Sequence, residues 1–255
     1  MTFNRRKLLR FVGGLPLLGA ASYASSCSSP PVDGIAEAES AKNWQEIFFD
    51  NFPGTELSSE WEKYTGQPSS DLNVRWDSDF VSVEGARLVL SGGLTDSGLK
   101  AGAVSLWRYP STYGKWEVRL RALPSRTFSY HLLLWPQDEQ WPPEIDFAES
   151  FDGTRQHIQG FIHYRDSSEA RQRVSMDAYV DVTADHTIAV EWTESHVSLL
   201  YDGQEWGRAT GEAVPHVPMW LALQVESQAT GSDHDNVSSS EPVLLVDWVR
   251  VSTLR

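Results

Sequence analysis

Apolar and polar residues alternate over short stretches from Trp44 onward, and no long pattern with a 3.6-residue period occurs. The run 115–123, KWEVRLRAL, places Trp116 and Leu120 on one face and charged side chains on the other. Because side chains in a strand alternate between two faces, this run predicts a half-buried strand. The run 128–135, FSYHLLLW, is apolar on both sides and predicts a central strand that is covered on both faces.

Several other runs repeat the two-residue alternation, with turn residues between them. The runs 188–192 and 197–201 alternate, and Asp-Gly at 202–203 follows as a hairpin turn. The run 243–251, VLLVDWVRV, is again extended. Strands at this spacing predict an all-β protein, a two-sheet antiparallel sandwich formed by one domain over 44–255.

The first residues have the character of an export signal. Arg5 and Arg6 open a basic region that resembles a twin-arginine signal, and an apolar stretch over 11–24 follows. That stretch of about 14 residues is too short for a transmembrane helix, which needs about 20. The sequence therefore predicts an export signal over 1–27, a polar linker over 28–43 and an extracytoplasmic location.

Cys27 is the only cysteine, so no internal disulfide can form. It lies where the signal would be cleaved, and two interpretations are open. In the first, Cys27 is the acylated cysteine of a lipoprotein, and this anchor is the only contact with a membrane. In the second, cleavage occurs near Ala24 and Cys27 has no role. We expect lipidation.

The overall charge excludes some classes of partner. The chain has 21 Lys and Arg against 35 Asp and Glu, a net charge of −14. A nucleic-acid-binding protein needs a basic face, so we expect no nucleic acid. The eleven Trp residues offer flat apolar faces that suit either a core or a sugar ring. The G-x-S-x-G, H-E-x-x-H and Walker motifs are absent from the sequence.

Within the segment WPQDEQWPPEIDFAES, over 135–150, three acidic residues lie in a strand-like stretch: Glu144, Asp146 and Glu149. Glu144 and Asp146 are two apart and face the same side of a strand. Glu149 is five residues after Glu144, and a regular strand would turn it to the far side. A β-bulge adds one residue and would bring Glu149 back into phase. The spacing therefore predicts three carboxyl groups on one face, provided that a bulge lies near 147–148.

Three carboxyl groups in one patch repel one another, which is unfavourable unless the site uses them. Hydrolysis of a glycosidic bond uses such a pair, one ionised and one protonated. The alternatives are a solvated acidic strand and a calcium site, because clustered carboxylates also bind hard cations. Trp141, followed by two prolines, favours the sugar interpretation, since an aromatic side chain beside carboxylates can stack on a sugar.

The segment 144–149, E-I-D-F-A-E, resembles the bulged E-[aliphatic]-D-x-x-E signature of glycoside hydrolase family 16, of the laminarinase- and agarase-like clan. Other segments resemble that family in the same order along the chain. They are FFDNFPGTELSSEWEKYTG from Phe48, YGKWEVRLRALP from Tyr113, FIHY from Phe161, DHTIAVEWTESHVSLLYDG from Asp185 and VDWVRV from Val246. The resemblance covers about 48–251, nearly the whole expected domain.

The resemblance implies a β-jelly-roll sandwich, concanavalin-like, with a substrate groove on its concave face. It implies a monomeric, endo-acting, retaining hydrolase of internal β-linkages in a glucan or galactan. Carried over by position, Glu144 is the nucleophile, Asp146 its assistant and Glu149 the acid/base. In a retaining enzyme the two outer carboxyl groups lie about 5–5.5 Å apart.

Further roles follow from the same resemblance. His163 would lie beside the carboxyl pair, and Trp141 would stack on a bound sugar. Four more residues are candidates for substrate contacts: Trp135, Arg75, Gln224 and Glu226. For each of these six, the alternative is an ordinary packing or surface role. No cofactor is required, although some members bind a structural calcium on the convex side, at the position of Asp247.

The segment LALQVESQATGS, over 221–232, departs from the Asn-rich strand of laminarin-cleaving members. It does not support assignment of a 1,3-glucan as the substrate. Two alternative functions use the same scaffold. One is a surface glycan-binding protein without turnover, and the other is a transglycosylase, in which a sugar rather than water completes the second step.

Overall fold

The computed structural model describes residues 43–67, 74–227 and 237–254. Their regular structure is almost entirely β, as the alternating pattern predicts. Two short 3-10 helices, η1 (Ser78–Phe80) and η2 (Gly211–Ala213), are the helical elements of this part of the chain. No helix within it is long and apolar enough to span a bilayer. The predicted export signal, the linker and Cys27 lie outside the described residues.

The strands form two sheets. The larger sheet contains β1 (Trp44–Asp50), β3 (Val74–Trp76), β4 (Val81–Val83), β5 (Leu88–Thr95), β6 (Gly98–Ala101), β8 (Gly114–Ala122), β13 (His186–Trp192), β14 (His196–Tyr201), β15 (Gln204–Thr210) and β17 (Glu241–Leu254). Its order is β15-β14-β13-β8-β17-β5-β6-β3, with β1 also paired to β17 and β4 to β5. All of these pairs are antiparallel except β3 with β6.

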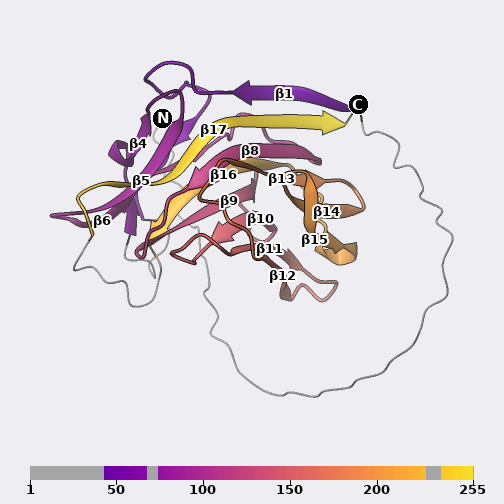
Figure 1. Cartoon of the computed structure of the whole chain (residues 1–255). Helices are drawn as coiled ribbons and strands as arrows, with labels where there is room; N and C mark the ends of the chain where they lie inside the picture. The colour runs from indigo at the N-terminus through magenta and orange to yellow at the C-terminus, as the bar shows by residue number, and fades with distance from the viewer. Residues whose placement is uncertain (1–42, 68–73, 228–236, 255) are drawn as a thin grey trace, which may run out of the picture.

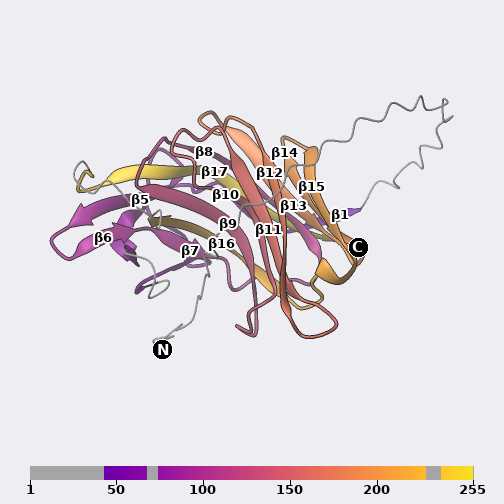
Figure 2. The same cartoon turned by 90° about the horizontal axis from the view of Figure 1, so that it is seen from below.

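The second sheet has seven strands and is antiparallel throughout. Its strands are β2 (Glu62–Lys63), β7 (Ala103–Ser105), β9 (Phe128–Pro136), β10 (Glu144–Ser150), β11 (Ile158–Arg165), β12 (Arg171–Ala178) and β16 (Met219–Ser227). Their order is β12-β11-β10-β9-β16-β7-β2. Figures 1 and 2 show the two sheets as curved layers, one lying over the other. The predicted two-sheet sandwich is confirmed.

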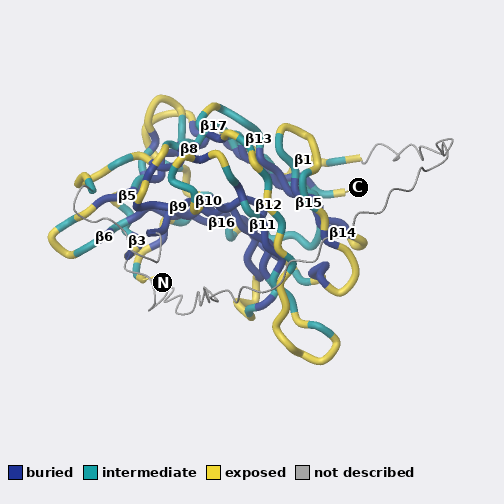
Figure 3. Tube along the Cα trace, turned by 60° about the horizontal axis from the view of Figure 1, so that its bottom comes forward, coloured by how far each residue is buried: buried dark blue, intermediate teal, exposed yellow. Residues whose placement is uncertain are grey.

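The alternating pattern of β8 explains which of its two faces packs in the core. Trp116 and Leu120 are fully buried, as are Val118 and Ala122, whereas the residues between them are partly exposed. The Trp116 ring stacks on that of Trp192 from β13, with ring centroids 6.0 Å apart. Figure 3 shows the buried residues along the facing strands and the exposed ones at the connections. Burial of this apolar face between the sheets is the main stabilising contribution to the fold.

Both strands that flank the predicted hairpin are present, and β14 and β15 meet at Asp202 and Gly203. Both turn residues have positive φ, 48° and 78°, as a tight two-residue hairpin turn requires. β17 is longer than the predicted run 243–251 and extends over Glu241–Leu254. It lies between β5 and β8 in the larger sheet and also pairs with β1, which explains its length.

Candidate active site

The three acidic residues lie on β10, and the strand is irregular between them. On β9, Asp146 is opposite Leu133 and Glu149 is opposite His131, with a register shift between Asp146 and Ala148. Leu133 and His131 are two residues apart on a regular strand, so they face the same side. Asp146 and Glu149 therefore share that side although three residues separate them. The pairing with β11 shifts in the same interval, between Asp146 and Glu149. The predicted bulge is present.

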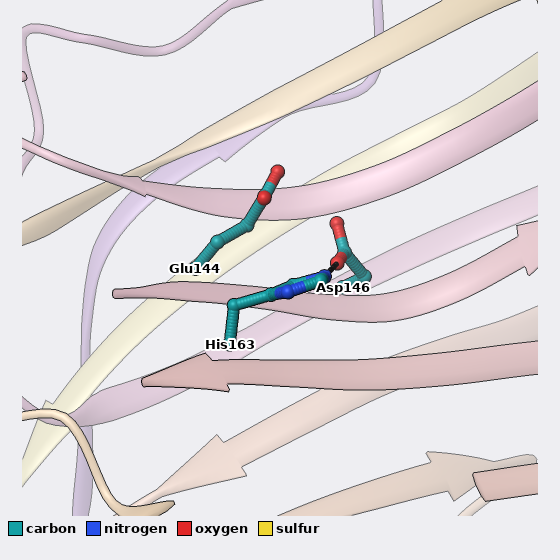
Figure 4. A group of neighbouring side chains, drawn as sticks. All are labelled: Glu144, Asp146 and His163. Atoms are coloured by element: carbon teal, nitrogen blue, oxygen red, sulfur yellow. Dashed lines mark ion pairs between the residues drawn. The ribbon is translucent and has the colours of Figure 1, made fainter. Parts of the chain in front are cut away.

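All three carboxyl side chains are removed from solvent. Glu144 and Asp146 are each 1% exposed and Glu149 is 3% exposed. Asp146 Oδ2 lies 3.4 Å from Nε2 of His163, which stands opposite Glu144 on β11. Figure 4 shows Glu144, Asp146 and His163 as one group of side chains. The strand pairing thus places the three acids on one side of the sheet, as the sequence predicts.

Donor atoms of Glu144, Asp146 and His163 lie within 4.8 Å of one another, which is the spacing of a metal site. Two carboxylates and one imidazole suit several divalent cations. The same three groups also suit a nucleophile with its supporting acid and histidine. Spacing alone does not separate these chemistries, so the site must be assigned from its other contacts.

Trp141 forms a hydrogen bond with Glu144, the first of the three acids. Its indole Nε1 donates a hydrogen bond of 2.8 Å to Glu144 Oε2. The Arg171 guanidinium lies over the Trp141 ring, 5.0 Å from its centroid, and the His163 ring is 5.5 Å away. Trp141 therefore orients Glu144 and is itself fixed by its neighbours. Its stacking on a sugar stays a prediction.

His131 contacts the last acid, Glu149, and is a site residue that the sequence did not predict. Its Nδ1 lies 2.7 Å from Glu149 Oε1, and its Nε2 lies 2.9 Å from Ser129 Oγ. Nε2 is also 3.7 Å from Glu226 Oε2 on β16. The available signal was a single histidine within the apolar run 128–135, two positions from a serine on the same face.

The predicted contacts on β16 lie on the same side of the sheet. Gln224 is opposite His131, and Glu226 is opposite Ser129. Gln224 is fully buried, and neither its amide oxygen nor its amide nitrogen has a hydrogen-bond partner among the described residues. Trp135 shares this side and is 1% exposed. The structure thus gathers these residues around the acids, while their contact with substrate stays a prediction.

Arg75 is placed elsewhere. It lies on β3 of the larger sheet, exposed between buried Val74 and Trp76. The Trp76 indole donates to the carbonyl oxygen of Val225 on β16, so Arg75, which alternates with it, points away from that contact. In the described part of the chain no ion pair joins Arg75 to the three acids.

Asp247 faces cations already present in the protein. Its two carboxylate oxygens lie 3.6 Å from Nε of Arg87 and 3.6 Å from Nε of Arg119. Calcium takes six to eight oxygen ligands, and two guanidinium groups repel it. The calcium site at Asp247 stays a prediction, and this donor set does not fit it.

The sequence model of glycosyl hydrolases family 16 matches residues 68–250, more than half of the chain. This chain belongs to that family. Its fold agrees, because the catalytic domain of an endo-1,3-β-glucanase (laminarinase) from Thermotoga petrophila superposes with a TM-score of 0.71. That comparison has 17% identity and covers 84% of this chain and 99% of the other. A Bacteroides ovatus family 16 protein from a mixed-linkage glucan locus, solved with a product, gives 0.71 at 18% identity, covering 80% and 99%.

Curated relatives of this family 16 chain include the endo-1,3-1,4-β-glycanase ExsH of Rhizobium meliloti, 25% identical over 150 residues. The alignment covers 57% of this chain and 31% of ExsH. The clotting factor G alpha subunit of Tachypleus tridentatus is 23% identical over 235 residues, which cover 82% of this chain and 34% of that protein. The chain spans about a third of the length of these relatives.

Proposed function

We propose that this chain is a retaining, endo-acting hydrolase of β-glycosidic bonds in a polysaccharide, a glucan or a galactan. The observation that carries the proposal is the bulge in β10, which places Glu144, Asp146 and Glu149 on one face. Family membership supports the same chemistry, since the matching curated relatives ExsH and EglC of Rhizobium meliloti are named endo-1,3-1,4-β-glycanases.

In the first step, a Glu144 carboxylate oxygen attacks the anomeric carbon, and the bond to the leaving oxygen breaks. Glu149 gives its proton to that oxygen, so the leaving sugar departs as a neutral alcohol. The product is a glycosyl ester on Glu144. Glu144 must be ionised and Glu149 protonated at the start, which two groups in different surroundings can achieve.

In the second step, the ionised Glu149 takes a proton from water while the water oxygen attacks the anomeric carbon. The ester bond to Glu144 breaks, and Glu149 is again protonated. Two displacements at one carbon retain its configuration. Asp146, which lies between the two glutamates and near His163, supports the orientation of Glu144. If a sugar hydroxyl replaces water, the same site performs transglycosylation.

The hydrogen bond from Trp141 to Glu144 suits the role of a nucleophile. The indole N–H donates to Oε2 and fixes the carboxylate, and the other oxygen, Oε1, can face the substrate. A nucleophilic carboxylate needs a fixed orientation toward the anomeric carbon, which this bond supplies. We therefore assign the cluster to glycosidic chemistry that requires no cofactor.

The experiment is hydrolysis of β-glucans and galactans, followed by the appearance of new reducing ends. Glu144→Gln removes the nucleophile and is expected to abolish nearly all turnover, while the variant stays folded and still binds oligosaccharide. The control is Glu84→Gln, in an exposed turn of the larger sheet. Binding by the wild-type protein without new reducing ends would favour the glycan-binding alternative.

We also propose that the protein is exported and anchored through acylated Cys27. The support is the leader sequence alone, with its paired arginines, apolar stretch and single cysteine. Labelled fatty acid incorporated by the wild-type protein and lost in Cys27→Ser would support the anchor. Cleavage upstream that leaves a free Cys27 thiol would contradict it.

A further inference from the structure

His131 connects three neighbouring strands of the seven-stranded sheet. It lies on β9, between Glu149 on β10 and Glu226 on β16. Its ring is 1% exposed, with Nδ1 2.7 Å from Glu149 Oε1 and Nε2 2.9 Å from Ser129 Oγ. The imidazole therefore contacts the proposed acid/base on one side and a polar pair on the other, away from solvent.

We infer that His131 is a positioning residue for Glu149, an inference that rests on the proposed function. Its Nδ1–H donates to Oε1 of Glu149 and fixes the rotation of the carboxyl group. Oε2 is then the oxygen that exchanges a proton with the glycosidic oxygen. His131 does not touch the substrate in this arrangement, and it acts through Glu149.

The surroundings of the ring favour a hydrogen on Nδ1. A nitrogen and an oxygen 2.7 Å apart need one hydrogen between them. The single hydrogen of the Ser129 hydroxyl has two acceptors within reach, Nε2 at 2.9 Å and the carbonyl oxygen of Glu226 at 3.2 Å. When it goes to the nearer one, Nε2, the neutral ring has its hydrogen on Nδ1; when it goes to the carbonyl, Nε2 is protonated and donates to Ser129. The Glu226 carboxylate, 3.7 Å from Nε2, stabilises the ring when both nitrogens are protonated. The neutral ring with its hydrogen on Nδ1 and the doubly protonated ring both supply a donor to Glu149.

This hydrogen bond favours the transition state more than the ground state. When Glu149 gives its Oε2 proton to the leaving oxygen, its carboxyl group becomes negative. A hydrogen bond to an ionised acceptor is roughly twice as strong as one to a neutral acceptor. The bond from His131 therefore strengthens as the proton leaves, and interactions of that kind raise kcat.

The alternative is that His131 only fills space. Its ring makes an edge contact with Phe151, with centroids 5.3 Å apart, so packing is part of its environment. A packing residue would affect every substrate to the same extent. A residue that supports the acid affects only substrates whose leaving group needs a proton, and this difference can be measured.

The experiment compares kcat/KM for two substrates that share one oligosaccharide: the natural β-linked form and the dinitrophenyl glycoside. Dinitrophenolate departs without protonation. General acid–base catalysis contributes about 10²–10⁴-fold in rate. His131→Leu should therefore lose roughly 10- to 100-fold on the natural substrate and less than about 3-fold on the dinitrophenyl glycoside. His131→Gln, which keeps an N–H donor, should recover part of the loss.

The matched control is His196→Gln. His196 is a buried histidine on β14 of the other sheet, bonded to Thr193 and Ser195. Any loss of kcat/KM in His196→Gln should be equal for the natural substrate and the dinitrophenyl glycoside. Equal losses in His131→Leu, or no loss, would overturn the inference. Nitrogen NMR of the wild-type ring is an independent readout that needs no variant, and a bare Nδ1 would also overturn it.

The same assays separate this inference from the proposed function. If the wild-type protein cleaves neither substrate, the proposed function fails and the inference falls with it. If Glu149→Gln keeps full activity on the natural substrate, the acid/base assignment fails. If Glu149→Gln shows the selective loss and His131→Leu does not, only the role of His131 is rejected.

Discussion

Trp141 donates its indole N–H to Oε2 of Glu144 across 2.8 Å, with the two residues only three positions apart in the sequence. The bond joins a residue before β10 to the first residue of that strand. Through this bond, Trp141 orients the carboxylate of Glu144, the proposed nucleophile. An aromatic residue at this position therefore has a polar role in addition to any contact with sugar.

Trp141→Phe keeps an aromatic ring and removes the donor. We expect kcat to fall by roughly 10-fold, because a net hydrogen bond to a charged group is worth about 1.5–3 kcal/mol and part of this remains through other contacts. KM should change little if the ring also stacks on a sugar. Steady-state kinetics measure the two effects separately. A rise in KM at constant kcat would show that stacking, not orientation of Glu144, is the main role.

Gln224→Leu tests whether the buried amide serves the substrate. A buried amide without a partner destabilises a fold, so its replacement by an apolar side chain of similar size should leave Tm unchanged or raise it. If the amide binds sugar hydroxyls, KM should rise roughly 10-fold. Thermal melting and kinetics on the same preparation decide this. A lower Tm with an unchanged KM would mean that Gln224 has a structural role.

Gly160→Ala probes the packing of β11 behind the site. A Cβ at Gly160 would collide with Leu199, approach Trp206 to 2.9 Å and lie 3.2 Å from the carbonyl oxygen of Asp146. Overpacking of this kind costs about 1–3 kcal/mol, which corresponds to a drop in Tm of roughly 2–12 °C in a domain of this size. Calorimetry measures the change. An unchanged Tm would mean that the side chains of Leu199 and Trp206 move aside without loss of packing.

The Asp185 carboxylate makes the free energy of unfolding depend on pH in the acidic range. A hydrogen bond from Arg87, which binds it through both Nη atoms at 3.1 and 2.9 Å, lowers its pKa below the usual 3.8. A lowered pKa means that the stabilisation is fully present above pH 3.8 and is lost as the pH falls through the folded-state pKa. This contribution is about 1 kcal/mol or less, because both side chains are partly exposed.

The test is urea unfolding of wild type and Asp185→Asn at several pH values between 2 and 7. The two proteins should differ at neutral pH and converge as the pH falls. Asp96→Asn, an exposed acid that forms no ion pair with a described residue, serves as the control and should track the wild type. A difference that persists at pH 2 would contradict the role of the ion pair.

The sequence predicted the strands whose two faces differ. β8 alternates strictly because one face packs in the core and the other is partly exposed, and its boundaries differ by only one residue from the prediction. β12 was not predicted, because its apolar face is limited to Val174, Met176 and Ala178, which are only partly buried, and because it lies at the sheet edge. Alternation therefore identifies strands with a long, fully buried face more readily than an edge strand such as β12.

Only the part of the candidate site that lies within one strand was predicted. Glu144, Asp146 and Glu149 are close in sequence, so their spacing predicts the bulge. The contact between His131 and Glu149 depends on the register of two strands, which single-strand periodicity does not contain. The run 128–135 is also apolar on both faces, so its sequence does not indicate which face lies at the site.

The most direct test of the central claim is trapping with a 2-deoxy-2-fluoro oligoglycoside that has a dinitrophenolate leaving group. The fluorine slows the second displacement, so a retaining enzyme accumulates its covalent intermediate. Peptide mapping by mass spectrometry should find one fluoro-oligosaccharide attached to Glu144. A label on another residue, or turnover of the natural substrate with inverted configuration and no adduct, would contradict the account.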